Sequence, residues 1–264
     1  MAPGVDRLIA AVRGDRIHGA AELTRRAAEV LIAAAGAPLD GIARELHAAQ
    51  PAMAPIWNVC QAALAAQHAG REAVVTACRE FVIRMERAVG GVARHALALI
   101  PDGSVVATHS ASEAVFESFR WAREQKRQFR VLATESRPQC EGVELAERLR
   151  ATGIETEIVI DAAMAQTMEL ASVAFVGADS ISPSSVVNKV GTRLLALAAH
   201  EAGKSLYALC PSMKRWDREA PPVEGFEATP RRLFRAIVTE EGELLSHPSH
   251  PARSGTSSSA SRAP

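Results

Sequence analysis

The pattern of hydrophobic and polar positions divides this chain into two parts. Up to about residue 95, stretches rich in Ala, Leu and Glu are separated by Gly and Pro, and no β-branched alternating run interrupts them. This pattern predicts helices over residues 18–35, 39–49, 53–68 and 71–89, with the last helix ending at Gly90-Gly91. We therefore expect residues 1–95 to form a helical domain.

A different pattern begins after residue 103, where short apolar runs alternate with longer helical stretches. The runs predict strands over residues 104–108, 129–134, 157–160, 173–176 and 205–209, and the stretches between them predict helices over 112–125, 142–151, 163–170 and 188–202. Strands that are almost entirely apolar are typical of a parallel sheet covered on both faces. The sequence thus predicts an α/β protein, in which the helical domain is followed by a Rossmann-like domain over residues 96–246, with a parallel sheet and helices on both faces. Residues 247–264, rich in Ser, Pro and Ala, are expected to be a disordered tail.

Composition excludes several classes of function. Lys plus Arg equals Asp plus Glu at 30 each, so no overall basic field indicates direct nucleic-acid binding. The apolar stretches are too short to cross a bilayer, and the start has no apolar signal-peptide region, so we expect no membrane contact. The four cysteines form no CxxC pair, which favours reduced thiols in a cytoplasm and no metal site. Neither a GxGxxG fingerprint nor a Walker A sequence occurs, and no cofactor is expected.

Polar and ionisable residues follow the predicted strands. Because ligands of open α/β sheets bind beyond the carboxyl ends of the strands, these residues predict a ligand crevice. They are Thr108-His109-Ser110, Glu135-Ser136-Arg137, Asp161, Gly177-Ala178-Asp179 and Cys210-Pro211.

Four short strings occur in a characteristic order. They are His18-Gly19-Ala20, Thr134-Glu135-Ser136-Arg137-Pro138 with Glu141-Gly142, Val176-Gly177-Ala178-Asp179-Ser180-Ile181, and Val187-Asn188-Lys189-Val190-Gly191-Thr192. Over residues 15–212 the chain resembles the family that joins the alpha, beta and delta subunits of translation initiation factor 2B, ribose-1,5-bisphosphate isomerase and methylthioribose-1-phosphate isomerase. The resemblance implies a small phosphorylated metabolite as ligand and a homodimer as the assembly.

The same resemblance assigns roles to individual residues. Asp179 matches the aspartate that handles a proton in the isomerases, and a carboxyl partly shielded from water has the raised pKa that this role needs. Asn188 and Lys189 match residues that hold the sugar hydroxyls and phosphate, and we expect them to begin a helix whose free N–H groups add to anion binding. The segment His18, Gly19 and Ala20, together with Arg137 and Glu141, completes the expected substrate site.

Other positions depart from the family pattern. Ser110 replaces the cysteine of the proton-handling pair, and a hydroxyl is a far weaker acid than a thiol of pKa about 8.5. His109 is not expected to activate Ser110, because neighbours on an extended segment point to opposite faces. His18 and Gln50 stand where the family has arginines, and Glu141 replaces a glutamine. Without the bidentate guanidinium clamps, the site is expected to hold a phosphate more weakly or to hold a different ligand.

The remaining thiols and lysines lead to weaker expectations. Cys140 or Cys210 could supply a thiol to the crevice, although packing as a small apolar side chain is the commoner role. Lys204, Lys214 and Arg215 are expected to be solvated.

Two functions remain open from the sequence. The first is an initiation factor 2B-like protein that binds a phosphorylated sugar or related metabolite at the strand carboxyl ends, without the cysteine-dependent isomerase chemistry. The alternative is an active aldose–ketose isomerase of the ribose-1,5-bisphosphate type that uses Asp179 as general acid and base. A nucleotide-exchange role in translation would need partner subunits, for which the sequence shows no contact surface.

Overall fold

The N-terminal part is a bundle of helices, as predicted. The computed structural model describes residues 3–15 and 18–245, so the predicted tail over 247–264 lies outside the described residues. The helices are α1 (Pro3–Gly14), α2 (Ala20–Ala34), α3 (Asp40–Ala49), α4 (Ala54–Ala66) and α5 (Arg71–Ala96). The sequence analysis missed α1, which buries Val5, Ile9 and Val12 at helical spacing against the core of the bundle.

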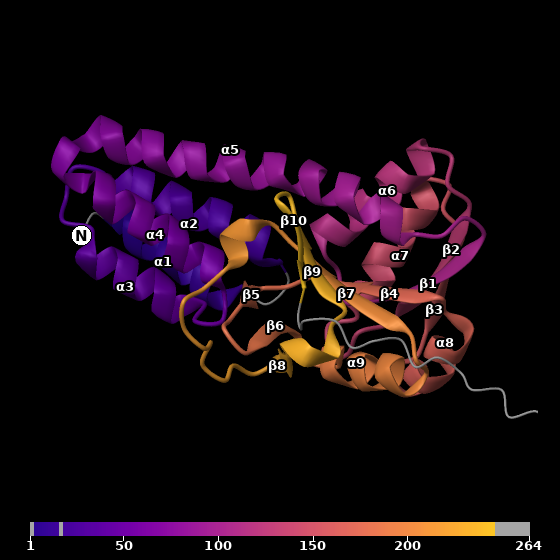
Figure 1. The fold of residues 1–264 in the computed structure, drawn as a ribbon. Coiled ribbons are helices and arrows are strands. Elements are labelled where there is room, and N and C mark those ends of the chain that lie inside the picture. Colours follow the sequence, from indigo (N-terminus) through magenta and orange to yellow (C-terminus); the bar gives the residue numbers. More distant parts are fainter. Residues whose placement is uncertain (1–2, 16–17, 246–264) are drawn as a thin grey trace, which may run out of the picture.

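The long helix α5 does not end where the sequence predicted. It continues through Gly90 and Gly91 to Ala96. A Cβ atom on Gly91 would lie 2.6 Å from the Cβ of Glu240, so a glycine is needed where the helix packs against the C-terminal hairpin. This close packing offsets the weak helix propensity of glycine, which costs about 1 kcal/mol relative to alanine. In Figure 1, α5 therefore extends from the helical bundle to the sheet of the second part.

The second part contains a seven-stranded sheet that is parallel except at one edge. Its strands are β1 (Ser104–His109), β2 (Phe129–Thr134), β3 (Thr156–Val159), β4 (Val173–Val176), β7 (Ser205–Leu209), β9 (Ala236–Thr239) and β10 (Gly242–Leu245). The order is β10-β9-β7-β4-β1-β2-β3, and only the β9–β10 pair is antiparallel. The five strands predicted from apolar runs are all present. The chain extends the sheet from β1 towards β3 and then crosses to β4 on the other side, so that the topological switch point lies between β1 and β4.

Helices cover both faces of this sheet, which confirms the predicted fold class. They are α6 (Glu113–Glu124), α7 (Glu141–Ala151), α8 (Met164–Leu170) and α9 (Thr192–Glu201). Side chains alternate along each strand, and Val106 of β1 belongs to the core under α5, α6 and α7, whereas Ala107 belongs to the core under α8 and α9. Figure 1 shows the two helical layers above and below the strands.

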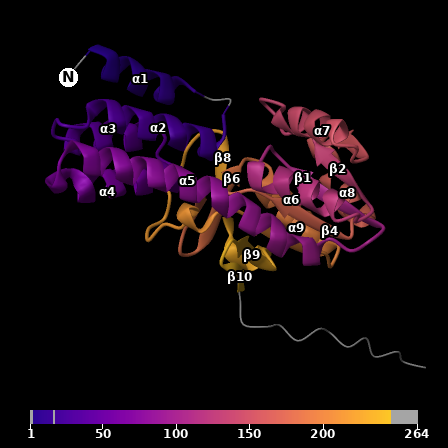
Figure 2. The same ribbon diagram turned by 90° about the horizontal axis from the view of Figure 1, so that it is seen from above.

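A second, smaller sheet corrects one prediction. Strands β5 (Ser180–Ile181), β6 (Ser185–Lys189) and β8 (Phe226–Pro230) form an antiparallel sheet, and in Figures 1 and 2 it lies between the helical bundle and the large sheet. Asn188 and Lys189 therefore end a strand instead of beginning a helix. Helix α9 starts only at Thr192, after Gly191 turns the chain at φ +103°. Pairing with β8, nearly forty residues further along the chain, holds these residues in the strand, and no local pattern reveals such a partner.

A contact between the two parts fixes the loop that follows β7. The side-chain amide of Asn58 on α4 donates to the carbonyl oxygens of Met213 at 2.7 Å and Arg215 at 3.1 Å. Helix α4 thus holds the 3-10 turn Ser212–Lys214. No helix in the described part of the chain is both long and apolar enough to cross a membrane.

Candidate functional site

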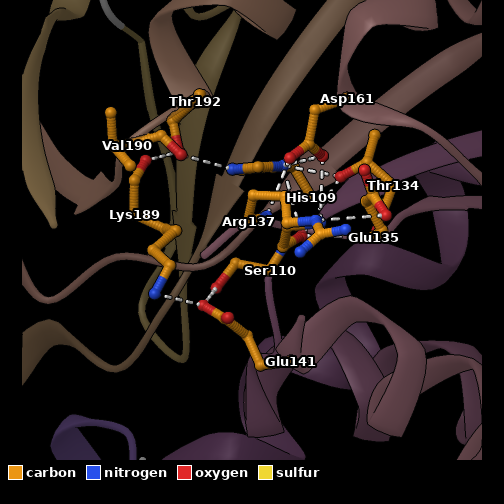
Figure 3. Close-up of polar contacts among 12 residues, drawn as sticks. His109, Ser110, Thr134, Glu135, Arg137, Glu141, Asp161, Lys189, Val190 and Thr192 are labelled. Atoms are coloured by element: carbon orange, nitrogen blue, oxygen red, sulfur yellow. Dashed lines mark hydrogen bonds and ion pairs between the residues drawn. The ribbon is translucent and has the colours of Figure 1, made fainter. Parts of the chain in front are cut away.

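The polar site lies at the carboxyl ends of the strands, where the sequence predicted a crevice. Three of the predicted residues contact one another there, as Figure 3 shows. The Oγ of Ser110 donates to the Oε1 of Glu141 at 3.0 Å, and the Nζ of Lys189 lies 2.7 Å from the same oxygen. Lys189 also donates to the Oε1 of Gln139 at 2.6 Å. These residues come from the ends of β1 and β6 and from the start of α7.

The start of α7 is fixed against the end of β2. Gly142 follows Glu141 in the helix, and a Cβ atom at this position would lie only 1.8 Å from the carbonyl oxygen of Thr134. Ser110 has a left-handed backbone with φ 66°, and its N–H donates to the Oγ of Ser136 at 2.7 Å. The motif glycine and the serine of the second string thus place Glu141 beside Ser110.

His109 is buried, and its ring joins the end of β2 to the loop after β6. Its Nδ1 lies 2.6 Å from the Oγ1 of Thr134, and its Nε2 lies 2.9 Å from the carbonyl oxygen of Val190. A carbonyl oxygen only accepts, so Nε2 carries a proton and Nδ1 accepts from the threonine hydroxyl. Burial lowers the pKa of His109, and the hydrogen bond to Val190 and the charge of Asp161 oppose this shift. As predicted, its ring has partners other than Ser110.

Asp179 lies across the switch point from Ser110, just after β4. It is buried, and its backbone N–H donates to the carbonyl oxygen of Val187 at 2.8 Å. Burial raises the pKa of its carboxyl; the positive charges of Lys214 and Lys189 partly oppose this rise, and Glu141 adds to it. Buried carboxyls of raised pKa occur often among groups that donate and accept protons at functional sites.

Lys214 corrects a second prediction, because it is buried and not solvated. Its Nζ donates a hydrogen bond to the carbonyl oxygen of Ala178, beside Asp179. The turn that carries it is held by α4, and no signal in the sequence around residue 214 could have shown this burial. Lys204 is exposed as predicted, whereas Arg215 is half-buried and pairs with Glu241 at 2.9 Å.

Arg137 does not join this group. Its side chain is 68% exposed and pairs with the Oε2 of Glu135 at 3.5 Å, while its backbone N–H donates to Asp161 at 2.8 Å. Arg137 thus lies apart from Lys189, Lys214, Glu141 and Asp179, whose charges act on one another.

The N-terminal candidates lie at the start of α2. Gly19 is the N-cap residue and Ala20 begins the helix. His18 is exposed, and its Nδ1 lies 2.7 Å from the Oδ2 of Asp15. None of the polar contacts recorded for the described residues joins His18 to the group around Lys189. Gln50 is buried, and its side-chain amide donates to the carbonyl oxygens of Val12 in α1 and of Asp15 just after that helix.

The two cysteines considered as alternative thiols differ in burial. Cys210 is fully buried, and burial raises the pKa of its thiol to about 12. Cys140 is half-buried at the N-cap of α7, and its Sγ lies 3.9 Å from the carbonyl oxygen of Pro138. Ser110 instead contacts a carboxylate.

Comparison with known proteins places this geometry in a family. The sequence profile of the initiation factor 2 subunit family matches residues 10–221. The chain belongs to this family. It is 35% identical to a translation initiation factor eIF-2B subunit 2-like protein of Pyrococcus horikoshii, over 89% of this chain and 94% of the relative. It is 28% identical to a ribose 1,5-bisphosphate isomerase of Archaeoglobus fulgidus, over 88% of this chain and 87% of the relative.

A solved structure of the family has the same fold. The crystal structure of the translation initiation factor eIF-2B of Pyrococcus horikoshii OT3 superposes with a TM-score of 0.85 at 32% identity, covering 93% of this chain and 98% of that chain. The recognition from the four strings and the predicted fold class are therefore correct.

Proposed function

We propose that this family member binds a phosphorylated sugar or related metabolite at the strand carboxyl ends, without the cysteine-dependent isomerase chemistry. The observation that carries the proposal is the hydrogen bond from the hydroxyl of Ser110 to the carboxylate of Glu141. A hydroxyl in this position keeps its proton, because the neighbouring negative charge opposes an alkoxide. Ser110 therefore cannot perform the proton transfer that a thiolate at this position could perform.

The crevice itself supports a small polar ligand. Buried cations and carboxyls from several strand ends surround the switch point, which is where α/β sheets bind ligands. Lys189 and Lys214 supply donors for the oxygens of a sugar phosphate, and Asn188, which precedes Lys189 in β6, is also buried. Relatives named as an initiation factor subunit and as an isomerase are both similar to this chain, so kinship alone does not choose between binding and catalysis.

A turnover assay separates the proposal from the isomerase alternative. The purified protein is incubated with ribose 1,5-bisphosphate or methylthioribose 1-phosphate, and ketose formation is followed by NMR. We expect no ketose from the wild type. Wild-type turnover that disappears in Asp179→Asn would instead establish the isomerase with Asp179 as its acid and base. Ser110→Cys shows whether a thiol alone restores the reaction.

Binding is tested separately by thermal unfolding with a panel of sugar phosphates. A ligand that binds the native state raises its melting temperature, by an amount that follows from its concentration and Kd. We expect at least one member of the panel to do so, with a smaller effect in Lys189→Met. If no sugar phosphate shifts the wild-type transition, the metabolite proposal is wrong.

We further infer that the protein is a cytoplasmic homodimer. Helix α9 supports the assembly, because Leu194 and Leu197 are 52% and 47% exposed on its surface and could pack against a second copy. The absence of CxxC pairs is compatible with a reducing compartment. Sedimentation equilibrium tests the assembly, and a mass of one chain at all concentrations would exclude the dimer. Cell fractionation tests the location.

A further inference from the structure

The carboxylate of Glu141 stands between a hydroxyl and an ammonium group from two other elements. Its Oε1 accepts from Ser110 after β1 and lies 2.7 Å from the Nζ of Lys189 at the end of β6 (Figure 3). The side chains of Lys189 and Glu141 are only 10% and 16% exposed. At this burial the pair is weakly screened, so the charge of Lys189 is balanced from within the protein.

The contacts of Lys189 leave one of its three protons for a ligand. Gln139 and Glu141 accept the first two, and none of the residues that the structure describes accepts the third. The remaining proton can donate to any ligand oxygen. A neutral hydroxyl oxygen meets this donor without a charge conflict, whereas a phosphate must share the ammonium with a carboxylate that already contacts it.

Glu141 itself is held in place. It lies in the first turn of α7, where the helix dipole favours a negative charge, and Gly142 fixes the start of that helix on β2. Its second oxygen, Oε2, is buried and has no hydrogen-bond partner among the described residues. The carboxylate is therefore anchored on one oxygen only, by Ser110 and Lys189.

We propose that Glu141 is a specificity-determining residue that acts as the internal counter-anion of Lys189. This end of the crevice then takes the uncharged, hydroxyl-bearing part of a ligand and selects against a phosphate group. The inference rests on the proposed function only in taking the ligand to be a phosphorylated sugar or related metabolite. The selection against phosphate at Lys189 follows from the contacts among Ser110, Glu141 and Lys189. Repulsion of the wrong group is a common means of specificity.

The substitution Glu141→Gln tests this role with almost no change of shape. The amide keeps an oxygen for Ser110 and Lys189, removes the negative charge, and places an NH2 donor where Oε2 now lacks a partner. Both changes favour an anion. We expect inorganic phosphate, measured by isothermal titration at low salt, to bind Glu141→Gln at least about tenfold more tightly than the wild type.

Two further variants show whether the gain in phosphate affinity is specific to position 141 and whether it requires Lys189. Glu144→Gln removes the same charge from an exposed position in the first turn of α7 and is expected to leave the phosphate affinity unchanged. The double variant Glu141→Gln/Lys189→Met is expected to lose the gain, because the freed ammonium is absent. Circular dichroism and melting temperature confirm that each variant is folded, and Glu141→Ala, which also frees Lys189, replaces Glu141→Gln if that variant does not fold.

The outcomes separate this inference from the proposed function. Equal phosphate affinity of the wild type and Glu141→Gln, an equal gain in Glu144→Gln, or a gain that persists without Lys189 would each overturn it. If the wild type binds sugar phosphates but Glu141→Gln gains nothing, only the role of Glu141 is wrong. If no sugar phosphate binds the wild type but Glu141→Gln gains phosphate affinity, the role of Glu141 stands and the metabolite proposal fails.

Discussion

Lys214 donates a hydrogen bond from its buried ammonium to the backbone carbonyl oxygen of Ala178, the residue before Asp179. A cation is thereby fixed beside the buried carboxyl on which the isomerase alternative depends. Lys214 opposes the raised pKa of Asp179 more than Lys189 does. Lys214 lies in the turn after β7 and Ala178 lies after β4, so this hydrogen bond joins the loops that follow the two strands.

Removal of Lys214 should therefore affect both stability and titration. In Lys214→Met the carbonyl of Ala178 loses its donor and Asp179 loses the cation that most opposes its pKa rise, so we expect the unfolding free energy to fall by about 3 kcal/mol. The pKa of Asp179 should rise further above its ordinary value. Urea unfolding and carboxyl NMR titration measure the two effects. The exposed Lys204→Met serves as control, with a change within about 0.5 kcal/mol; equal losses in both variants would contradict the role of Lys214.

Asp179 should make stability depend on pH in a defined direction. Its pKa in the folded protein is raised above the ordinary value of 3.8, so the native state binds this proton more tightly than the unfolded chain does. Its contribution is favourable below pH 3.8 and is lost as the pH rises through the folded pKa.

The variant Asp179→Asn isolates this effect from the other titrating groups. We expect the unfolding free energy of the wild type, relative to Asp179→Asn, to decrease as the pH rises above 3.8 and through the folded pKa. Chemical denaturation of both proteins at a series of pH values measures the difference. A difference that increases with pH would mean that the folded protein stabilises the ionised carboxyl, contrary to the cause assigned here.

Gly191 should not tolerate a side chain. Its φ is +103°, and a Cβ atom would lie 2.7 Å from the Nε2 of His109. We expect Gly191→Ala to lose about 3 kcal/mol, through backbone strain and displacement of a buried ring. Gly203→Ala is the matched control, since its φ is also positive at +65° but nothing lies within 4 Å of the added atom. Its cost should be about 1 kcal/mol in the same denaturation experiment; similar losses would exclude the contact with His109 as the cause.

The thiols should differ sharply in reactivity. Burial raises the pKa of Cys60 and Cys210 to about 12 and that of Cys78 to about 11, so these thiols stay protonated and shielded. Cys140 is half-buried. In the native protein at neutral pH we expect a thiol reagent to label Cys140 alone, and Cys140→Ser to remain unlabelled. Mass spectrometry of labelled peptides identifies the labelled cysteine. Rapid labelling of Cys210 would contradict its burial and would favour Cys210 as the thiol that takes the place of the family's cysteine.

The sequence predicted the large sheet well because its strands carry a local signal. Strands β2, β4 and β7 have the predicted bounds, since each is a mostly apolar run; β4 is buried along its whole length, and β2 and β7 are buried at their carboxyl ends. Ser110 was predicted as a site residue because it follows an apolar strand, whereas Glu141 and Lys189 were predicted from the family resemblance. The three side chains do come together. The rule that ligands bind beyond the carboxyl ends of parallel strands can be applied without knowing which side chains contact one another.

The remaining features depend on contacts between distant segments. Strand β6 pairs with β8, so the placement of Asn188 and Lys189 in a strand could not follow from their neighbours. Lys214 is buried because α4 holds its loop, and a lysine in a polar segment carries no sign of this. Gly91 was predicted to end a helix, whereas its lack of a side chain serves contact with Glu240, which lies about 150 residues later.

The continuity of α5 has a consequence for engineering the protein. Its first half completes the core of the helical bundle, and its second half packs against α6 and β9. Helix α5 therefore belongs to both parts of the protein, and it joins them without a flexible linker. An exchange of N-terminal parts between relatives has to transfer all of α5 together with Glu240, which faces Gly91, because a junction placed at Gly90-Gly91 would cut through a continuous helix.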